Sequence, residues 1–215
     1  MDHTIANLLR IKKEINLKDS HNTKIIAVTK TFPVDKILPL LKFGHIDFGE
    51  NKVQEAILKW SKIKDDYKDI KLHMIGKLQT NKVKHAVKIF DYIHSVDNLK
   101  LAEKISQEQK KINKNIKLFI QVNIGSEDQK NGINSQDVKN FLNICIKEFQ
   151  LDIIGLMCIP PNDNKEEKYF SKMLNLKKQL DLNGLSMGMS NDYLLAIEYG
   201  STYVRIGSKI FGLRN

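Results

Sequence analysis

The chain has 215 residues, of which 41% are hydrophobic, so it is long enough to bury one sizeable core as a single α/β domain. The net charge of +10 comes from lysines spread along the chain, since only three of the 35 basic residues are arginine, and no specific nucleic-acid partner is expected. No apolar run approaches the roughly 18 residues of a membrane span and no leader-like segment opens the chain, which excludes a membrane partner and predicts a cytoplasmic protein.

The first predicted element is an amphipathic helix that lies outside the rest of the fold. Ile5, Leu8, Leu9, Lys12 and Ile15 recur at helical spacing. Short apolar runs of strand length then alternate with helical patterns to the end of the chain. The predicted strands span 24–30, 45–49, 71–76, 92–96, 118–123, 152–159, 185–190 and 203–207.

The connecting segments carry three- and four-residue hydrophobic spacing, which is typical of helices that cover a sheet. Pro39 lies within the first of them and is expected to kink or shorten that helix, because proline removes a backbone hydrogen bond. Later helices are predicted from about Val53, after Gln79–Lys82, over 99–111, and through the apolar positions of 138–145 and 169–180. The two cysteines, Cys145 and Cys158, show no metal-ligand spacing, so buried thiols and no metal site are expected.

Eight strands alternating with helices predict a closed parallel (β/α)8 barrel of the TIM type with an extra N-terminal helix. Nothing in the pattern suggests a second domain, so residues 1–215 are expected to form one. An open doubly wound sheet is the alternative, although that fold uses fewer strands in a chain of this length.

Lys30 ends the apolar run of the first strand, at the edge where a barrel of this type keeps its active site. Burial disfavours the charged form of an amine, and a neutral amine can condense with an aldehyde to form an imine. In a chain with this many lysines, a solvated side chain is the plain alternative.

Two turns of small residues follow the last two strands, where barrels often bind phosphate. Ser190 ends strand 185–190, and Gly207-Ser208 ends strand 203–207. Exposed backbone N–H groups and a following helix dipole favour an anion at such turns. The alternative is that both serines only cap the following helices.

Three further polar residues need an explanation. Arg205 alternates with the apolar Val204 and Ile206, so it points to the opposite face, either toward a ligand acceptor or into an ion pair with an acid such as Glu50 or Glu198. Asn51 could orient a bound ring or cap the helix that begins near Val53. His73 lies inside a strand, where a hydrogen-bonded core histidine is favoured over a catalytic base.

Several segments occur together, in order and at barrel spacing, and they jointly resemble one known family. The chain resembles the YggS/PROSC family of pyridoxal phosphate homeostasis proteins, which are related to the N-terminal barrel of alanine racemase, nearly from end to end. The matching motifs are Ala27-Val28-Thr29-Lys30, Phe48-Gly49-Glu50-Asn51, 73–82, Val122-Asn123 with Glu127, Lys130 and Gly132, 155–160, Met187-Gly188-Met189-Ser190 and 200–208.

The resemblance implies that pyridoxal 5'-phosphate is the cofactor and that Lys30 forms the internal aldimine with it. It also implies that Ser190 and the Gly207-Ser208 turn hold the phosphate, that Arg205 faces the pyridine nitrogen and that Asn51 lines the pocket. An arginine does not readily lose a proton, so it would leave that nitrogen unprotonated and weaken the ring as an electron sink.

The resemblance favours a noncatalytic carrier that takes part in intracellular homeostasis of the cofactor. Racemase relatives add a second, β-rich domain with a tyrosine base, for which the chain after Ser208 is too short. The alternatives are a weak fold-type III amino-acid racemase and a colourless protein-binding or RNA-binding barrel. The expected partners of a carrier are other vitamin B6 vitamers and apoenzymes that depend on the cofactor, and the expected state is a monomer.

Overall fold

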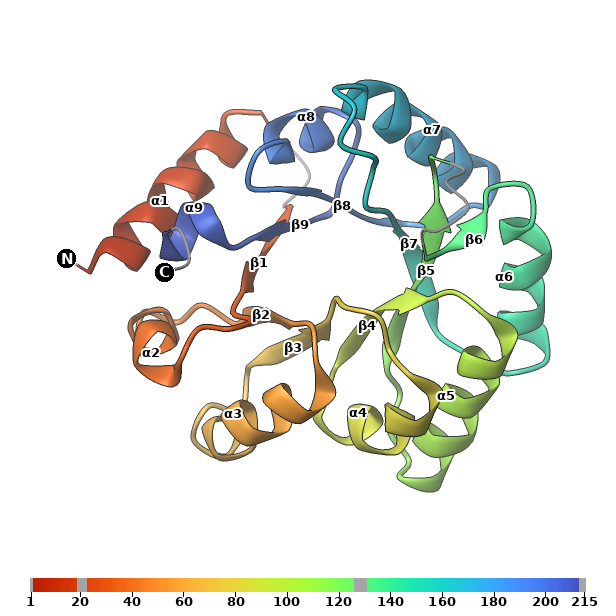
Figure 1. Cartoon of the computed structure of the whole chain (residues 1–215), viewed down its shortest axis with the longest axis horizontal. Helices are drawn as coiled ribbons and strands as arrows, with labels where there is room; N and C mark the ends of the chain where they lie inside the picture. The colour runs from red at the N-terminus through yellow and green to blue at the C-terminus, as the bar shows by residue number, and fades with distance from the viewer. Residues whose placement is uncertain (1, 19–22, 126–130, 213–215) are drawn as a thin grey trace.

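A computed structural model describes residues 2–18, 23–125 and 131–212, and these form a closed parallel barrel (Figure 1). Strand order runs β4-β3-β2-β1-β9-β8-β7-β5, and pairing of β4 with β5 closes the ring. The closed barrel is therefore confirmed and the open sheet is excluded. The strands are β1 (Lys24–Val28), β2 (Asp47–Glu50), β3 (Lys71–Met74), β4 (Tyr92–Val96), β5 (Lys117–Asn123), β7 (Ile153–Met157), β8 (Gly184–Met189) and β9 (Tyr203–Ile206), with a short β6 (Ile133–Asn134) beside β5.

Helices surround the strands as an outer ring, and the first and last helices lie side by side where the two ends of the chain meet (Figure 1). Among the described residues, no helix combines the length and apolar character required to cross a bilayer. The helices are α1 (His3–Asn16), α2 (Val34–Lys42), α3 (Val53–Asp66), α4 (Val83–Ile89) after the 3-10 turn η1 (Thr80–Lys82), α5 (Leu99–Lys111), α6 (Val138–Lys147), α7 (Glu166–Gln179), α8 (Tyr193–Glu198) and α9 (Ser208–Phe211).

The first helix is amphipathic as predicted, and the second is not cut short by its proline. The inward face of α1 carries Leu8, Ile11 and Ile15, whereas Leu9 is 38% exposed. Pro39 does not end α2, which continues to Lys42. A proline within a helix removes one backbone hydrogen bond, and burial of Ile37, Leu40 and Leu41 against the core offsets that loss.

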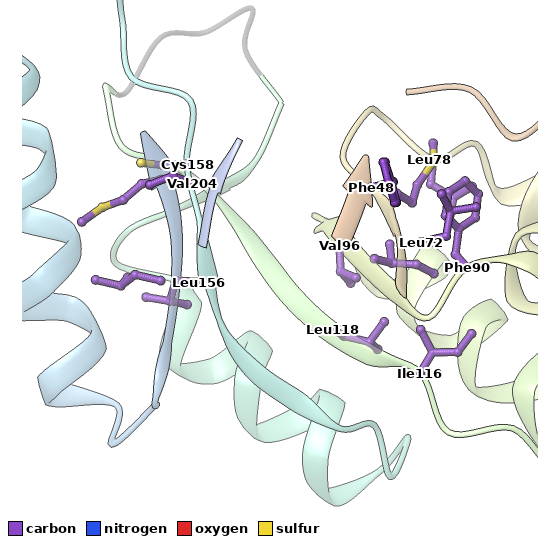
Figure 2. Close-up of a cluster of buried hydrophobic side chains, with 14 of the residues drawn as sticks. Phe48, Leu72, Leu78, Phe90, Val96, Ile116, Leu118, Leu156, Cys158 and Val204 are labelled. Carbon is purple, nitrogen blue, oxygen red and sulfur yellow. The ribbon is translucent and has the colours of Figure 1, made fainter. Parts of the chain in front are cut away.

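The hydrophobic core has two parts. The larger part fills the space between the strands and the helices and includes Phe48, Leu72 and Phe90 (Figure 2). The smaller part lies inside the barrel and consists of Ile26, Tyr92, Phe119, Met157 and Tyr203. Both cysteines are buried free thiols, as predicted.

Gly155 of β7 and Gly184 of β8 are register partners, and the two strands can approach there only because neither has a side chain. A Cβ atom at position 155 would lie 2.2 Å from the carbonyl oxygen of Gly184. Gly155→Ala should therefore lower the free energy of unfolding by about 3 kcal/mol or more, measured by urea denaturation.

Gly44→Ala is the matched control for this glycine. A Cβ atom at position 44 would have no other atom within 4 Å, but the residue has a φ of +86°, so only backbone strain of about 1 kcal/mol is expected. Equal losses in the two variants would contradict the close strand approach at Gly155.

Candidate functional site

A cavity of about 840 Å³ opens at the C-terminal ends of the strands. Its walls come mainly from β1, β7, β8 and β9 and the segments that follow them, with Asn51 after β2 and Ile75 after β3, and β1, β9, β8 and β7 are consecutive neighbours in the barrel. The structure brings all six sequence-predicted site residues to this one cavity, although they lie far apart in the sequence. These residues are Lys30, Asn51, Ser190, Arg205, Gly207 and Ser208.

Lys30 follows β1 by two residues and is partly buried at the cavity wall. Val28, Phe32 and Ile75 line the same cavity and give this side an apolar character. Among the described residues, Lys30 is the single lysine that lines the cavity. A primary amine in such surroundings is suited to condensation with an aldehyde.

The two small-residue turns lie next to each other across the cavity wall. The backbone N–H of Lys209 donates to Ser190 Oγ over 3.4 Å, which links the loop after β8 to the start of α9. The N-cap positions of α8 and α9 are Asp192 and Gly207, and neither makes a side-chain cap hydrogen bond. Neither serine therefore occupies the N-cap position of the helix that follows it, while Ser190 Oγ accepts from an N–H in the first turn of α9.

Arg205 is 5% exposed and reaches the cavity from inside the barrel. Its Nη1 donates to the carbonyl oxygen of Ser186 over 2.6 Å and to Ser186 Oγ over 2.9 Å, and its Nη2 donates to the carbonyl oxygen of Cys158 over 2.8 Å. Burial lowers the pKa of this guanidinium, and the nearby Asp192 acts against that shift.

The predicted alternative of an ion pair between Arg205 and Glu50 or Glu198 is wrong. Glu50 instead pairs with Lys59, and Glu198 pairs with Lys18. Both carboxylates belong to the outer side of the barrel, whereas alternation directs Arg205 inward. Fixed carbonyl and hydroxyl acceptors hold the guanidinium in place of a carboxylate.

Asn51 lines the cavity directly after β2 and is partly buried. The N-cap of α3 is Lys52, without a side-chain cap hydrogen bond, so the structure does not support a capping role for Asn51. The loop after β3 passes so close that a Cβ atom at Gly76 would lie 2.4 Å from the carbonyl oxygen of Asn51. This close approach fixes the backbone of Asn51 at the cavity wall.

A row of buried polar side chains leads from Arg205 through the barrel interior. Ser186 Oγ lies 2.8 Å from His94 Nδ1, and His94 Nε2 lies 3.0 Å from His73 Nδ1. His73 Nε2 lies 3.0 Å from Asp47 Oδ1, which ends the row. The prediction that His73 is a hydrogen-bonded core histidine is confirmed, and this residue does not line the cavity.

With both histidines neutral, the chemistry of the two ends fixes the direction of every hydrogen bond in this interior row. A carboxylate only accepts, so His73 Nε2 donates to Asp47, and the bare Nδ1 of His73 accepts from His94 Nε2. His94 Nδ1 then accepts from the Ser186 hydroxyl, whose oxygen accepts from Arg205. Each neutral histidine is therefore in a single tautomer, with the hydrogen on Nε2.

The charge states agree with this arrangement. Burial lowers the pKa of His73, although Asp47 acts in the opposite direction. Burial, His73 and Arg205 lower the pKa of His94 well below its ordinary value. Burial acts to raise the pKa of Asp47, but the hydrogen bond from His73 is the largest of the effects that hold it below the ordinary value.

Sequence reasoning missed part of the site. The cavity also includes segments after β3 and β7, represented by Ile75 and Ile159. Strand alternation in Tyr92–Val96 could have placed His94 on the inward face, where it meets Ser186. The motif residues Glu127 and Lys130 lie outside the residues that the structure describes.

Comparisons with known proteins give one consistent result. The family model "Alanine racemase, N-terminal domain" matches residues 1–215. The pyridoxal phosphate homeostasis protein of Vibrio alginolyticus is 35% identical over 221 residues, covering 98% of this chain and 95% of that protein. The corresponding protein of Aquifex aeolicus is 38% identical over 200 residues, covering 89% and 87%.

Solved structures agree with the sequence matches. The structure of PipY from Synechococcus elongatus with pyridoxal phosphate bound has a TM-score of 0.85 and 32% identity, covering 97% of this chain and 100% of that chain. An alanine racemase of Clostridium difficile has a TM-score of 0.76 at 16% identity, and the match covers 57% of its length. The racemase likeness shows a shared barrel fold.

Proposed function

Because the chain belongs to the family of pyridoxal phosphate homeostasis proteins, built on the alanine racemase N-terminal domain, we propose that it binds pyridoxal 5'-phosphate in the cavity at the strand ends. One observation carries this proposal. Lys30, Arg205 and the turns after β8 and β9 line the same cavity, so an amine, a fixed cation and two small-residue loops face one space.

The residues present fit the chemistry of this cofactor. The cofactor supplies an aldehyde that reacts with amines, and Lys30 supplies the amine for a C=N bond that forms with release of one water. Ser190 and the Gly207-Ser208 turn offer hydroxyl and backbone donors for a phosphate group. Arg205 can only donate hydrogen bonds, so it matches an unprotonated ring nitrogen. Asn51 adds an amide at the wall beside Lys30.

We favour a noncatalytic carrier that stores and releases the cofactor. Racemisation needs a base on each face of the substrate, and no tyrosine or histidine lines the cavity among the described residues. A fixed arginine at the ring nitrogen weakens the ring as an electron sink, which also supports a carrier. We further propose that residues 1–215 act as one monomeric domain that exchanges the cofactor and other B6 vitamers with apoenzymes.

A weak racemase is the competing function, and one observation favours it. The carboxylates of Glu166 and Asp192 line the cavity and are the available candidates for a second base among the described residues. Burial raises the pKa of Asp192, which makes this carboxylate a stronger base than one in water.

Cofactor transfer and proton exchange distinguish the two functions. We expect the protein with bound cofactor to absorb near the violet edge of the visible spectrum and to restore activity to an apoenzyme that needs the cofactor. We also expect it to leave the α-deuteron of deuterated alanine in place. Loss of that deuteron at an enzyme-like rate, abolished in Glu166→Gln or Asp192→Asn, would instead establish a racemase. A colourless protein that never takes up the cofactor would contradict both functions.

A further inference from the structure

The two peptide groups that flank Lys30 are each hydrogen-bonded by a side chain of α3. Lys59 Nζ donates over 2.8 Å to the carbonyl oxygen of Thr29, which belongs to the peptide group before Lys30. The backbone N–H of Thr31, in the peptide group after Lys30, donates over 2.8 Å to Glu55 Oε1. One helix therefore holds the backbone on both sides of this lysine.

Lys59 is itself fixed by a buried carboxylate at the end of β2. Glu50 is fully buried, and its Oε1 accepts from Lys59 Nζ at 2.8 Å, Thr29 Oγ1 at 2.7 Å and Trp60 Nε1 at 2.9 Å. The side chain of Lys59 is only 8% exposed. A buried carboxylate needs a compensating cation, so Lys59 has little freedom to leave this position. We call Glu50, Glu55 and Lys59 the α3 clamp.

The backbone that the α3 clamp holds is one that the chain does not adopt easily. Thr31 has a φ of +68°, in the left-handed region, which costs a residue other than glycine about 1–2 kcal/mol. A β-branched threonine is especially unsuited to it. Without the acceptor at Glu55, Thr31 would relax toward a right-handed or extended conformation, and the direction of the Lys30 side chain would change with it.

We propose that Glu55 and Lys59 are positioning residues for Lys30, which set the orientation of its amine in the cavity. This inference rests on the proposed function, because it gives the α3 clamp the role of orienting Lys30, the lysine proposed to bind the aldehyde. A purely structural role would act through the core instead. Glu55 has a 30% exposed side chain and Thr31 is exposed, so their hydrogen bond contributes little to core packing.

The test compares Glu55→Ala with Glu55→Gln. Alanine removes the acceptor for the Thr31 N–H, whereas the glutamine amide oxygen can still accept it. Asp65→Ala is the matched control, since Asp65 is a carboxylate on the same helix in an exposed pair with Lys68. The cofactor-free proteins are treated with pyridoxal, which lacks the phosphate, and a mild hydride trap, and labelling of Lys30 is followed by mass spectrometry.

Glu55→Ala should label Lys30 at least about tenfold more slowly than the parent, because a misdirected amine reaches the aldehyde less often. Glu55→Gln and Asp65→Ala should label at close to the parent rate. Amide hydrogen exchange at Thr31 should speed up in Glu55→Ala alone, while the urea midpoint stays within experimental error.

The two possible failures are distinguishable in this experiment. If the parent protein does not label at Lys30, the proposed function fails. If the parent labels there and Glu55→Ala labels equally fast with faster Thr31 exchange, the proposed function stands and the positioning role is overturned. A slower rate accompanied by a lower urea midpoint in Glu55→Ala, not restored by Glu55→Gln, also overturns it in favour of a structural role.

Discussion

Replacing Lys30 by alanine is expected to abolish the violet absorbance band of the loaded protein and the adduct trapped by borohydride. The reason is that, among the described residues, no other lysine lines the cavity, so none of them offers a second amine for the bond to the aldehyde. Lys30 is only partly buried and belongs to the mouth of the barrel, so the free energy of unfolding should change by less than about 1 kcal/mol.

The variant should still bind the cofactor, but without the covalent bond. The residues assigned to the phosphate and the ring nitrogen lie on β8 and β9 and their loops, and the substitution does not touch them. Titration should therefore show weaker binding of a species that absorbs as the free aldehyde. Lys52→Ala is the control, because Lys52 is an exposed lysine next to Asn51 and should leave the spectrum unchanged. An adduct located by mass spectrometry on another lysine would contradict the assignment.

The second large effect is a loss of stability in acid, caused by buried neutral histidines. Burial, with a contribution from Lys12, lowers the pKa of His45 from 6.5 to about 4, against the opposing effect of Asp47. His73 and His94 also have lowered pKa values for which burial is the largest cause. Below pH 6.5 the unfolded chain binds protons that the folded chain excludes, so stability falls as the pH decreases.

The size of this loss can be estimated for His45. A shift from 6.5 to about 4 corresponds to about 3 kcal/mol of stability that is present above pH 6.5 and lost between pH 6.5 and 4. The two interior histidines add to the loss in the same direction. Urea midpoints of the cofactor-free protein, measured at intervals from pH 7.5 to pH 4.5, should therefore decrease steadily below pH 6.5.

Two variants distinguish the contribution of His45 to the loss of stability in acid from the contributions of other groups. His45→Gln should reduce the dependence of stability on pH, because one proton fewer is taken up on unfolding. His85→Asn should leave that dependence unchanged, since His85 is exposed on α4. A urea midpoint that is constant between pH 7.5 and pH 4.5 would show that the buried histidines are not held neutral.

The barrel could be predicted from the sequence because each of its strands and helices has a hydrophobic pattern within its own short segment. Each strand is a short apolar run, and the helices between them repeat their apolar residues every three or four positions. Segment 99–111 and segment 92–96 match α5 and β4 at both ends. Where tertiary packing decides, the sequence was a poorer guide, as for the exposure of Leu9 on α1 and the continuation of α2 through Pro39.

The cavity residues could be predicted for a different reason. A closed parallel barrel brings every strand end to one mouth, so a polar residue at a strand end is a site candidate whatever its distance along the chain. This rule placed Lys30, Ser190 and Arg205 together. The identity of the cofactor was not contained in that rule, and it came from the resemblance of ordered motifs to a known family.

The interior row and the α3 clamp could not be predicted in this way. His94 and Ser186 are 92 positions apart, and their contact depends on the register of β4 and β8, which are not adjacent in the barrel. Glu55 and Lys59 look like ordinary surface residues of an amphipathic helix. Only the path of the chain after β1 shows that they reach the peptide groups around Lys30.

Every hydrogen bond of the interior row donates in the same direction, from Arg205 toward Asp47. This common direction restricts the substitutions that are possible at the residues of the row. A substitute for Ser186 must accept on the side of Arg205 and donate toward His94, a requirement that threonine meets and alanine or valine does not. Asparagine at position 47 would have to present its oxygen rather than its nitrogen to His73. During evolution, substitutions at these positions should therefore occur together. Each set of substitutions must keep one donor and one acceptor at every hydrogen bond of the interior row.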